Sequence, residues 1–131
     1  MSLPSSRLFD LSNGKLQKYA IITQQTERLV IDRYRLQLTE SEAISILQRA
    51  QQRTLHKDVV TVEDQQYIIT TVRQRSFYGI RLVGKVPGGI CLVMAGPSLI
   101  VAVYNELMPP QVVPSVEQFA DEMVAQLSQG T

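Results

Sequence analysis

The second half of the chain constrains the fold most, because it contains a series of short segments of strand character. Each segment is rich in β-branched or aromatic residues, and the breaks between them contain glycine, proline or polar residues that favour turns. Turns this short join neighbouring antiparallel strands. The pattern predicts an antiparallel meander of strands at Val59–Val62, Tyr67–Val72, Phe77–Val83, Ile90–Met94 and Leu99–Tyr104.

The first half predicts a hairpin with a short helix before it. Tyr19–Thr23 is a continuous apolar run of strand type, Gln24–Glu27 is a polar turn, and Arg28–Ile31 is the partner strand. Two leucines followed by a helix stop signal predict the short helix, at Leu8, Leu11 and Asn13-Gly14.

A middle helix is expected after the hairpin. Thr39–Glu42 is a capping box, in which the Thr39 hydroxyl accepts the backbone N–H of Glu42 while Glu42 reaches back. The polar run Gln51–Thr54 ends the helix. One apolar face follows the cap and consists of Ala43, Ile44, Leu47 and Ala50.

A last helix is expected to begin at Pro114 or Ser115, because Ser115 and Gln118 have the spacing of a second capping box. Its buried stripe is predicted to consist of Val116, Phe119, Ala120, Met123 and Leu127. Since each helix has one apolar stripe to bury, a sheet with helices on its two faces is the economical packing.

Size and composition indicate one soluble domain. The chain has 131 residues, and its hydrophobic content of 44% supports a core. A net charge of +1 argues against a general polyanion binder. No apolar run reaches the roughly 18 residues that a membrane span needs. The N-terminal residues lack the order of a signal peptide, so an intracellular location is expected.

The residues that usually carry catalysis are isolated. His56 is the only histidine and lies in a polar stretch, and the single Cys91 lies in an apolar strand, where an inert buried thiol is expected. The acid pairs Glu63-Asp64 and Asp121-Glu122 are neighbours in sequence, so their side chains diverge. The segment 84–89 lacks the spacing and the following helix of a phosphate-binding loop. We expect no catalytic residue, metal or cofactor.

A basic segment leaves three interpretations open. Between Gln66 and Ile90 every charge is positive, and aromatic residues lie among the charges. The segment could be a positive solvent face, a platform for single-stranded nucleic acid, or a surface for an acidic protein partner. The residues alone favour the solvent face. The four cations are Arg73, Arg75, Arg81 and Lys85, and the aromatic residues are Tyr67, Phe77 and Tyr78.

One stretch, Gly88–Pro110, resembles the profilin family, especially its plant-type members. The residues that carry the likeness are Gly88-Gly89, Tyr104-Asn105-Glu106 and Met108-Pro109-Pro110. Further similarity lies in Lys18–Thr23, in Leu36–Glu42 and in Gln66–Thr70, before which Glu63-Asp64 replaces a glycine pair of the family. The resemblance implies one profilin-like domain over 1–131, of class α+β. Its central antiparallel sheet would have the N- and C-terminal helices on one face and a middle helix on the other.

The resemblance also implies a function. Profilins bind monomeric actin and regulate its polymerisation and nucleotide exchange, in the cytoplasm and at the cytoskeleton, so a monomeric, non-enzymatic actin binder is expected. The actin-binding positions carried over are Thr71, Arg73, Arg81, Val83, Lys85, Met108, Pro109, Pro114, Glu117 and Gln118. Anionic phosphoinositide lipids would bind at Arg73, Arg75, Arg81 and Lys85.

The proline-binding residues of the family are missing. The chain has no tryptophan; Leu29 or Val30 occupies that position in the hairpin. The N-terminal aromatic positions align nearest Leu3 and Ser6, with Phe9 the only aromatic in reach, and Glu122 takes a His or Tyr position. We therefore expect polyproline binding to be weak or absent.

Two alternatives to actin binding remain at this point. One is a single-stranded nucleic-acid binder that uses Arg73, Arg75, Tyr78 and Arg81, although no nucleic-acid partner is expected from the net charge. The other is a small α/β regulatory or scaffold module that pairs with itself or with a GTPase.

Overall fold

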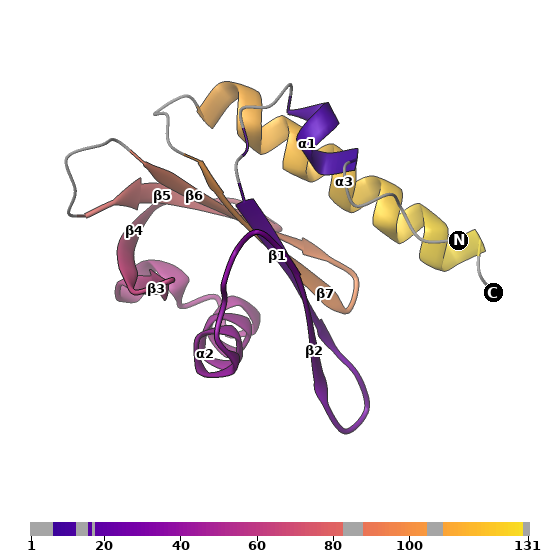
Figure 1. Ribbon diagram of the computed structural model, residues 1–131, viewed down its shortest axis with the longest axis horizontal. Coiled ribbons are helices and arrows are strands. Elements are labelled where there is room, and N and C mark those ends of the chain that lie inside the picture. The colour runs from indigo at the N-terminus through magenta and orange to yellow at the C-terminus, as the bar shows by residue number, and fades with distance from the viewer. Residues whose placement is uncertain (1–6, 13–15, 17, 83–87, 105–108, 130–131) are drawn as a thin grey trace.

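The computed structural model describes residues 7–12, 16, 18–82, 88–104 and 109–129, and of 109–111 and 127–129 it describes the backbone alone. These residues form a curved antiparallel sheet between two helical layers (Figure 1). The helices are α1 (Arg7–Leu11), α2 (Glu40–Gln51), the short 3-10 helix η1 (Leu55–Lys57) and α3 (Pro109–Gln129). The strands are β1 (Lys18–Gln24), β2 (Leu29–Tyr34), β3 (Val60–Val62), β4 (Gln65–Val72), β5 (Ser76–Arg81), β6 (Gly89–Ala95) and β7 (Ser98–Tyr104).

The sheet has the order β2-β1-β7-β6-β5-β4-β3, and every neighbouring pair is antiparallel. Strands β3 to β7 form the predicted meander, and the predicted hairpin β1–β2 joins it by pairing β1 with β7. The central strands β6 and β7 are buried on both faces, which explains why they read as continuous apolar runs.

Two separate cores lie on the two faces of the sheet. One contains Leu8 of α1, Cys91 of β6 and Phe119 of α3. The other contains Ile46 of α2 and Phe77 of β5. Helices α1 and α3 therefore cover one face, which we call the α3 face, and α2 covers the other, the α2 face (Figure 1). The expected fold class and arrangement of helices are confirmed.

The start of α2 is as predicted, but its buried face is not. The Thr39 hydroxyl accepts from the Glu42 N–H at 3.1 Å, and the Glu42 carboxylate accepts from the Thr39 N–H at 3.1 Å. The buried side chains are Ala43, Ile46, Leu47 and Ala50. Ile44 was expected among them and is 41% exposed, because the stripe at i, i+3, i+4 and i+7 passes through Ile46 instead.

The start of α3 was predicted wrongly. The helix begins at Pro109, and Pro114 and Ser115 lie within it. Proline is tolerated in a first turn, where backbone N–H groups have no helical partner, so the Pro109-Pro110 pair suits the start. Ser115 is not the N-cap of a second capping box, because it lies inside the helix; its hydroxyl donates to the Leu11 carbonyl of α1 at 3.0 Å.

Candidate functional site

None of the described helices covers the part of the α3 face formed by β4 and β5. Helix α3 packs over β6 and β7, whereas β5 and β4 lie farther along the sheet. There Ile68 of β4 and Ile80 of β5 are direct cross-strand partners and are 39% and 42% exposed. Leu82 follows at 44% exposure. Side chains of this size are usually buried, so the patch is suited to a protein partner.

The register shows which face these residues occupy. Tyr78 packs against the core of the α3 face and is the cross-strand partner of Thr71. Ile80 is two positions from Tyr78 on the same strand, so it points to the same side. We call this patch, formed by Ile68, Thr71, Tyr78 and Ile80, the β4–β5 surface.

Two of the predicted cations, Arg73 and Arg75, border this surface and have different partners. The Arg73 guanidinium lies over the Tyr78 ring at 5.6 Å. Arg75 forms an ion pair with Asp121 of α3 at 2.7 Å and also donates to the Glu117 carbonyl at 3.5 Å. The hydrogen bond from Arg75 lowers the pKa of Asp121. The charge of Arg75 is thus largely compensated within the protein.

The side of α3 that faces β5 adds polar and apolar contacts. Glu117 accepts a hydrogen bond from the Ser76 hydroxyl at 2.7 Å, which anchors α3 to β5. Pro114 and Gln118 are exposed and lie within one helical turn of Glu117, on the same side of α3 as Asp121. Among the predicted positions, Thr71 and Arg73 lie at the β4–β5 surface, and Glu117 links α3 to β5. Pro114 is exposed on the adjoining side of α3, whereas the Gln118 amide donates to the Glu122 carboxylate at 3.4 Å.

Arg81 does not belong to this surface. It is the cross-strand partner of Tyr67 and lies over the Tyr67 ring at 5.8 Å, and Tyr67 is part of the α2-face core. Arg81 therefore projects on the opposite face from Thr71. The predicted nucleic-acid set and the predicted phosphoinositide set both contain Arg81, so neither set forms one cluster in the described residues. Val83, Lys85 and Met108 lie outside the described residues, as does the side chain of Pro109.

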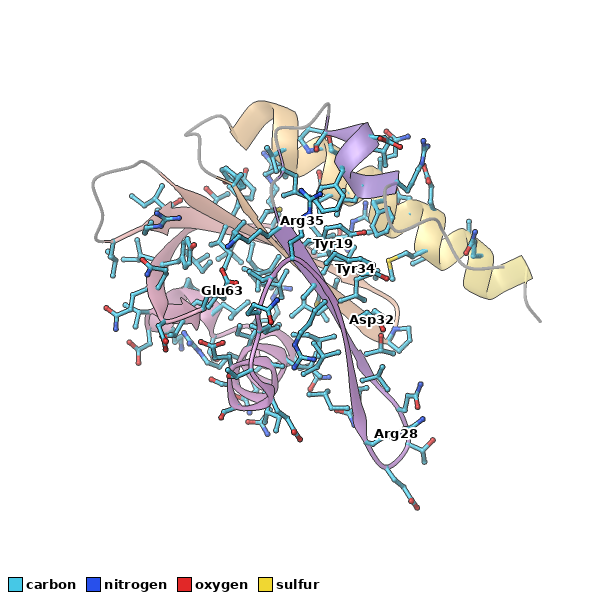
Figure 2. The ribbon with its side chains drawn as sticks, viewed as in Figure 1. Tyr19, Arg28, Asp32, Tyr34, Arg35 and Glu63 are labelled. Carbon is cyan, nitrogen blue, oxygen red and sulfur yellow. The ribbon has the colours of Figure 1, made fainter. Side chains whose placement is uncertain are left out.

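An aromatic group lies between α1, α3 and the first hairpin, and it is larger than the sequence indicated. Tyr19 is stacked on Tyr34 at 4.5 Å between ring centroids (Figure 2). The Phe9 and Phe119 rings also contact Tyr19, at 5.1 Å and 5.9 Å between centroids. Burial, and then the negative charge of Asp32, raise the pKa of Tyr34. Phe9 was expected to be the only aromatic in reach. Tyr34 was missed because only the pairing of β1 with β2 brings it there.

No arrangement for catalysis is evident in the described part of the chain. It contains no group of three or more potential metal ligands. His56 is exposed in η1, and Cys91 is fully buried, which raises the pKa of its thiol. A groove of about 410 Å³ lies between the hairpin tip and α2. Its walls consist mainly of amide side chains such as Gln24 and Gln48 and aliphatic side chains such as Ile44, with a few scattered charged groups. No helix among the described residues is long and apolar enough to cross a membrane.

Comparison with known proteins decides the family. Residues 6–127 match the sequence model of the family described as Profilin. The chain belongs to the profilin family. The family assignment accounts for the seven-stranded sheet and for the two helices that share the α3 face. No curated protein sequence matches the chain.

Several solved profilins have the same fold. Profilin from Schizosaccharomyces pombe has a TM-score of 0.75 at 22% identity, and the match covers 95% of this chain and 98% of that one. Profilin IB from Acanthamoeba castellanii has a TM-score of 0.73 at 19% identity, with the same coverage. LokiProfilin2, solved in a complex with rabbit actin, has a TM-score of 0.73 at 17% identity, again covering 95% and 98%.

Proposed function

We propose that this profilin binds monomeric actin through the β4–β5 surface and the adjoining side of α3. By occupying one end of the monomer it would regulate polymerisation and nucleotide exchange, in the cytoplasm at the actin cytoskeleton. Family membership supports the proposal, as does the likeness to LokiProfilin2 and LokiProfilin1, both solved with rabbit actin. The observation that carries it is the exposed Ile68–Ile80 pair beside α3.

The surface has the composition of a protein interface. Its centre is apolar, and its rim carries Arg73. In such interfaces the apolar centre supplies most of the affinity, while rim charges mainly steer association. Arg73 is therefore expected to affect the association rate and its salt dependence, and Ile80 to affect the dissociation rate.

The test is calorimetry and polymerisation of monomeric actin with three variants. Ile80→Asp should weaken binding by at least about 30-fold, since loss of an interface anchor costs about 2 kcal/mol or more. Arg73→Glu should slow association, most strongly at low salt. Ile44→Asp is the matched control, because Ile44 is equally exposed on α2 at 41%, on the other face.

The proposal fails if the wild-type chain does not bind actin at high micromolar concentration. A different result would relocate the surface: binding that survives Ile80→Asp but is lost in Ile44→Asp would place actin on the α2 face. Circular dichroism of each variant shows that it is folded.

Other ligands have less support. Phosphoinositide binding was expected at four cations, but Arg75 is paired with Asp121 and Arg81 lies on the opposite face. Polyproline binding requires exposed flat aromatic faces. Tyr19 is fully buried, and the Arg35 guanidinium lies over the Phe9 ring at 5.3 Å. We keep the prediction that proline-rich ligands bind weakly; a chemical-shift titration with a proline decamer that saturates at low micromolar concentration would contradict it.

A further inference from the structure

Among the described residues, the outer edge of β2 has no strand partner, so β2 forms one end of the sheet. β2 pairs with β1 on its inner side and ends the strand order. Figure 1 shows the β1–β2 hairpin projecting at one end of the sheet. A free edge presents unpaired backbone groups and can accept a further strand unless it is blocked. The identity of a matching strand can be derived from β2 itself.

The hydrogen bonds of β1 show which residues of β2 present their backbone at this edge. The Gln25 N–H donates to the Arg28 carbonyl at 2.9 Å, whereas the Gln24 N–H points away from β2, to the Pro97 carbonyl at 3.2 Å. Hydrogen-bonding direction alternates along a strand. Since Gln24 is opposite Leu29, the N–H and C=O groups of Leu29 and, two residues on, Ile31 point outward from the sheet.

The side chains of β2 alternate between the two faces. Ile31 is opposite Ile22 of the α2-face core, so Leu29 and Ile31 share the α2 face. Asp32 is opposite Ile21 of the α3-face core, so Asp32 shares the α3 face with Val30. Arg28 lies just before β2, but its carbonyl accepts from the Gln25 N–H as the next pair of the ladder, so the alternation continues to Arg28. The Arg28 Nε donates to the Gln25 side-chain oxygen at 3.2 Å within the same chain. Arg28 and Asp32 are both exposed (Figure 2).

We propose that a second copy of this chain pairs with the free edge of β2, so that two copies form a two-fold dimer with one continuous sheet. A two-fold axis perpendicular to the sheet keeps every side chain on its own face. In an antiparallel pair, residues that are directly opposite each other point to the same face, so in two copies of β2 their residue numbers must differ by an even number. The two-fold axis then passes beside one residue, which is opposite its own copy and forms the centre of the register.

The register centred on Val30 is the one that β2 satisfies. It places Arg28 opposite the partner's Asp32 and Leu29 opposite the partner's Ile31. The two ion pairs formed by symmetry lie on the α3 face, and the aliphatic pairs lie on the α2 face. Leu29 and Ile31 are also the residues whose backbone groups point outward, so they can exchange hydrogen bonds with their opposites.

The neighbouring registers are less favourable. Centring on Asp32 places two carboxylates opposite each other, and centring on Arg33 does the same with two guanidinium groups. Centring on Ile31 places Asp32 opposite Val30. Charges on an edge strand commonly block pairing. Here the charges at positions 28 and 32 have opposite signs and are symmetric about Val30, so in a two-fold dimer they attract.

The proposed dimer differs from the monomer expected from the sequence, and it is compatible with actin binding. The β4–β5 surface is at the other end of the strand order from β2, with β1, β7 and β6 between them. Self-pairing and actin binding, which the sequence set as alternatives, therefore use separate surfaces. Pairing along one short edge buries little area, so the dimer should be weak and dependent on concentration.

The experiment is sedimentation equilibrium of the full chain from about 10 μM to about 1 mM, a range that covers weak association. Arg28→Asp and Asp32→Arg should each weaken dimerisation at least about tenfold, because each places like charges opposite each other. An equimolar mixture of these two variants should form a heterodimer. The Arg28→Asp chain carries acids at positions 28 and 32, and the Asp32→Arg chain carries arginines at both positions, so each acid is opposite an arginine. The double variant should restore the homodimer. Lys57→Asp, an exposed reversal on η1, is the matched control and should have no effect.

A wild-type chain that is monomeric at the highest concentration would overturn the proposal. So would a dimer that both single reversals leave unchanged, or two monomeric single variants that do not associate when mixed. None of these results bears on the actin proposal, because the readout contains no actin.

Discussion

The turn between β3 and β4 yields a stability prediction whose size follows from the structure. Val62 and Gln65 are paired, and the two residues between them have positive φ, 53° for Glu63 and 61° for Asp64. Two such residues in succession form the type of tight turn that favours glycine, because a Cβ in the left-handed region costs about 1–2 kcal/mol. Glu63 and Asp64 both carry a Cβ, so the turn holds local strain.

Asp64→Gly should stabilise the protein. It removes about 1–2 kcal/mol of strain, and the more flexible unfolded chain takes back about 0.5–1 kcal/mol, which leaves a net gain of about 0.5–1 kcal/mol. The backbone N–H of residue 64, which donates to the Glu42 carboxylate at 3.4 Å, is kept. The expected rise in Tm is about 2–5 °C.

Glu63→Gly should have the opposite result, although it relieves the same kind of strain. The Glu63 carboxylate accepts from the Lys18 ammonium at 3.1 Å and from the Gln37 N–H at 2.7 Å. The half-exposed ion pair contributes below about 1 kcal/mol and the backbone hydrogen bond about 1–1.5 kcal/mol. Their combined loss exceeds the gain, so a net loss of about 1 kcal/mol is expected.

Urea unfolding followed by far-UV circular dichroism measures both effects, since the chain has no tryptophan to report by fluorescence. Glu63→Gln is the control, because it keeps the strained backbone and removes the charge; it should destabilise the protein. If the Asp64→Gly protein is no more stable than wild type, the turn between β3 and β4 does not store the strain inferred from its positive φ angles. A Glu63→Gly protein stabilised as much as Asp64→Gly would refute the bridging role of the carboxylate.

Three further predictions concern packing, ion pairing and thiol chemistry. Gly79→Ala should destabilise the protein by about 2–4 kcal/mol in urea unfolding, because a methyl group there would overlap the Ile68 carbonyl; an unchanged midpoint would contradict this. Arg7 forms a two-bond ion pair with Glu122, at 2.9 Å for each bond, and lowers the Glu122 pKa. Its contribution should therefore persist at neutral pH and be lost as the pH falls through the folded-state pKa. The measurement is the hydrogen-exchange protection factor of α1, which corrects for the intrinsic pH dependence of exchange and should fall at low pH. Glu122→Gln should lower that protection at neutral pH, and wild-type protection that is equal at both pH values would count against the prediction. Cys91, whose thiol pKa is raised by burial, should react with a thiol reagent only after unfolding, and rapid labelling of the native chain would show that the strand opens.

The sequence was sufficient for the elements whose signals are local. The capping box at Thr39 gave the start of α2, and turn residues separated the strands of the meander. Where two signals competed, the prediction was wrong: Pro114 and Ser115 both suggest a helix start, but Pro109-Pro110 begins α3 more than one turn earlier. Tyr34 shows a different limit, since its stacking on Tyr19 depends on pairing that no local pattern specifies.

A β-bulge explains why the candidate site was only partly predictable. By simple alternation, Tyr67, Ile69, Thr71 and Arg73 would share one face of β4. The register instead shifts between Ile69 and Thr71, and the Thr70 hydroxyl donates to the Tyr78 carbonyl at 3.3 Å. Thr71 therefore moves to the face of Tyr78, while Tyr67 and its partner Arg81 stay on the α2 face.

The sequence does contain a signal for this bulge, and it is Gly79. Gly79 lies opposite Ile69 at the shift, and its lack of a Cβ allows the Ile68 carbonyl to approach closely. A lone glycine inside a strand pattern often marks a bulge. If Gly79 is interpreted as the sign of a bulge, the sequence alone predicts that Arg81 and Thr71 lie on opposite faces of the sheet. Because one inserted residue reverses the alternation of everything after it, the bulge places Thr71 beside the exposed Ile68–Ile80 pair and leaves Arg81 on the other side.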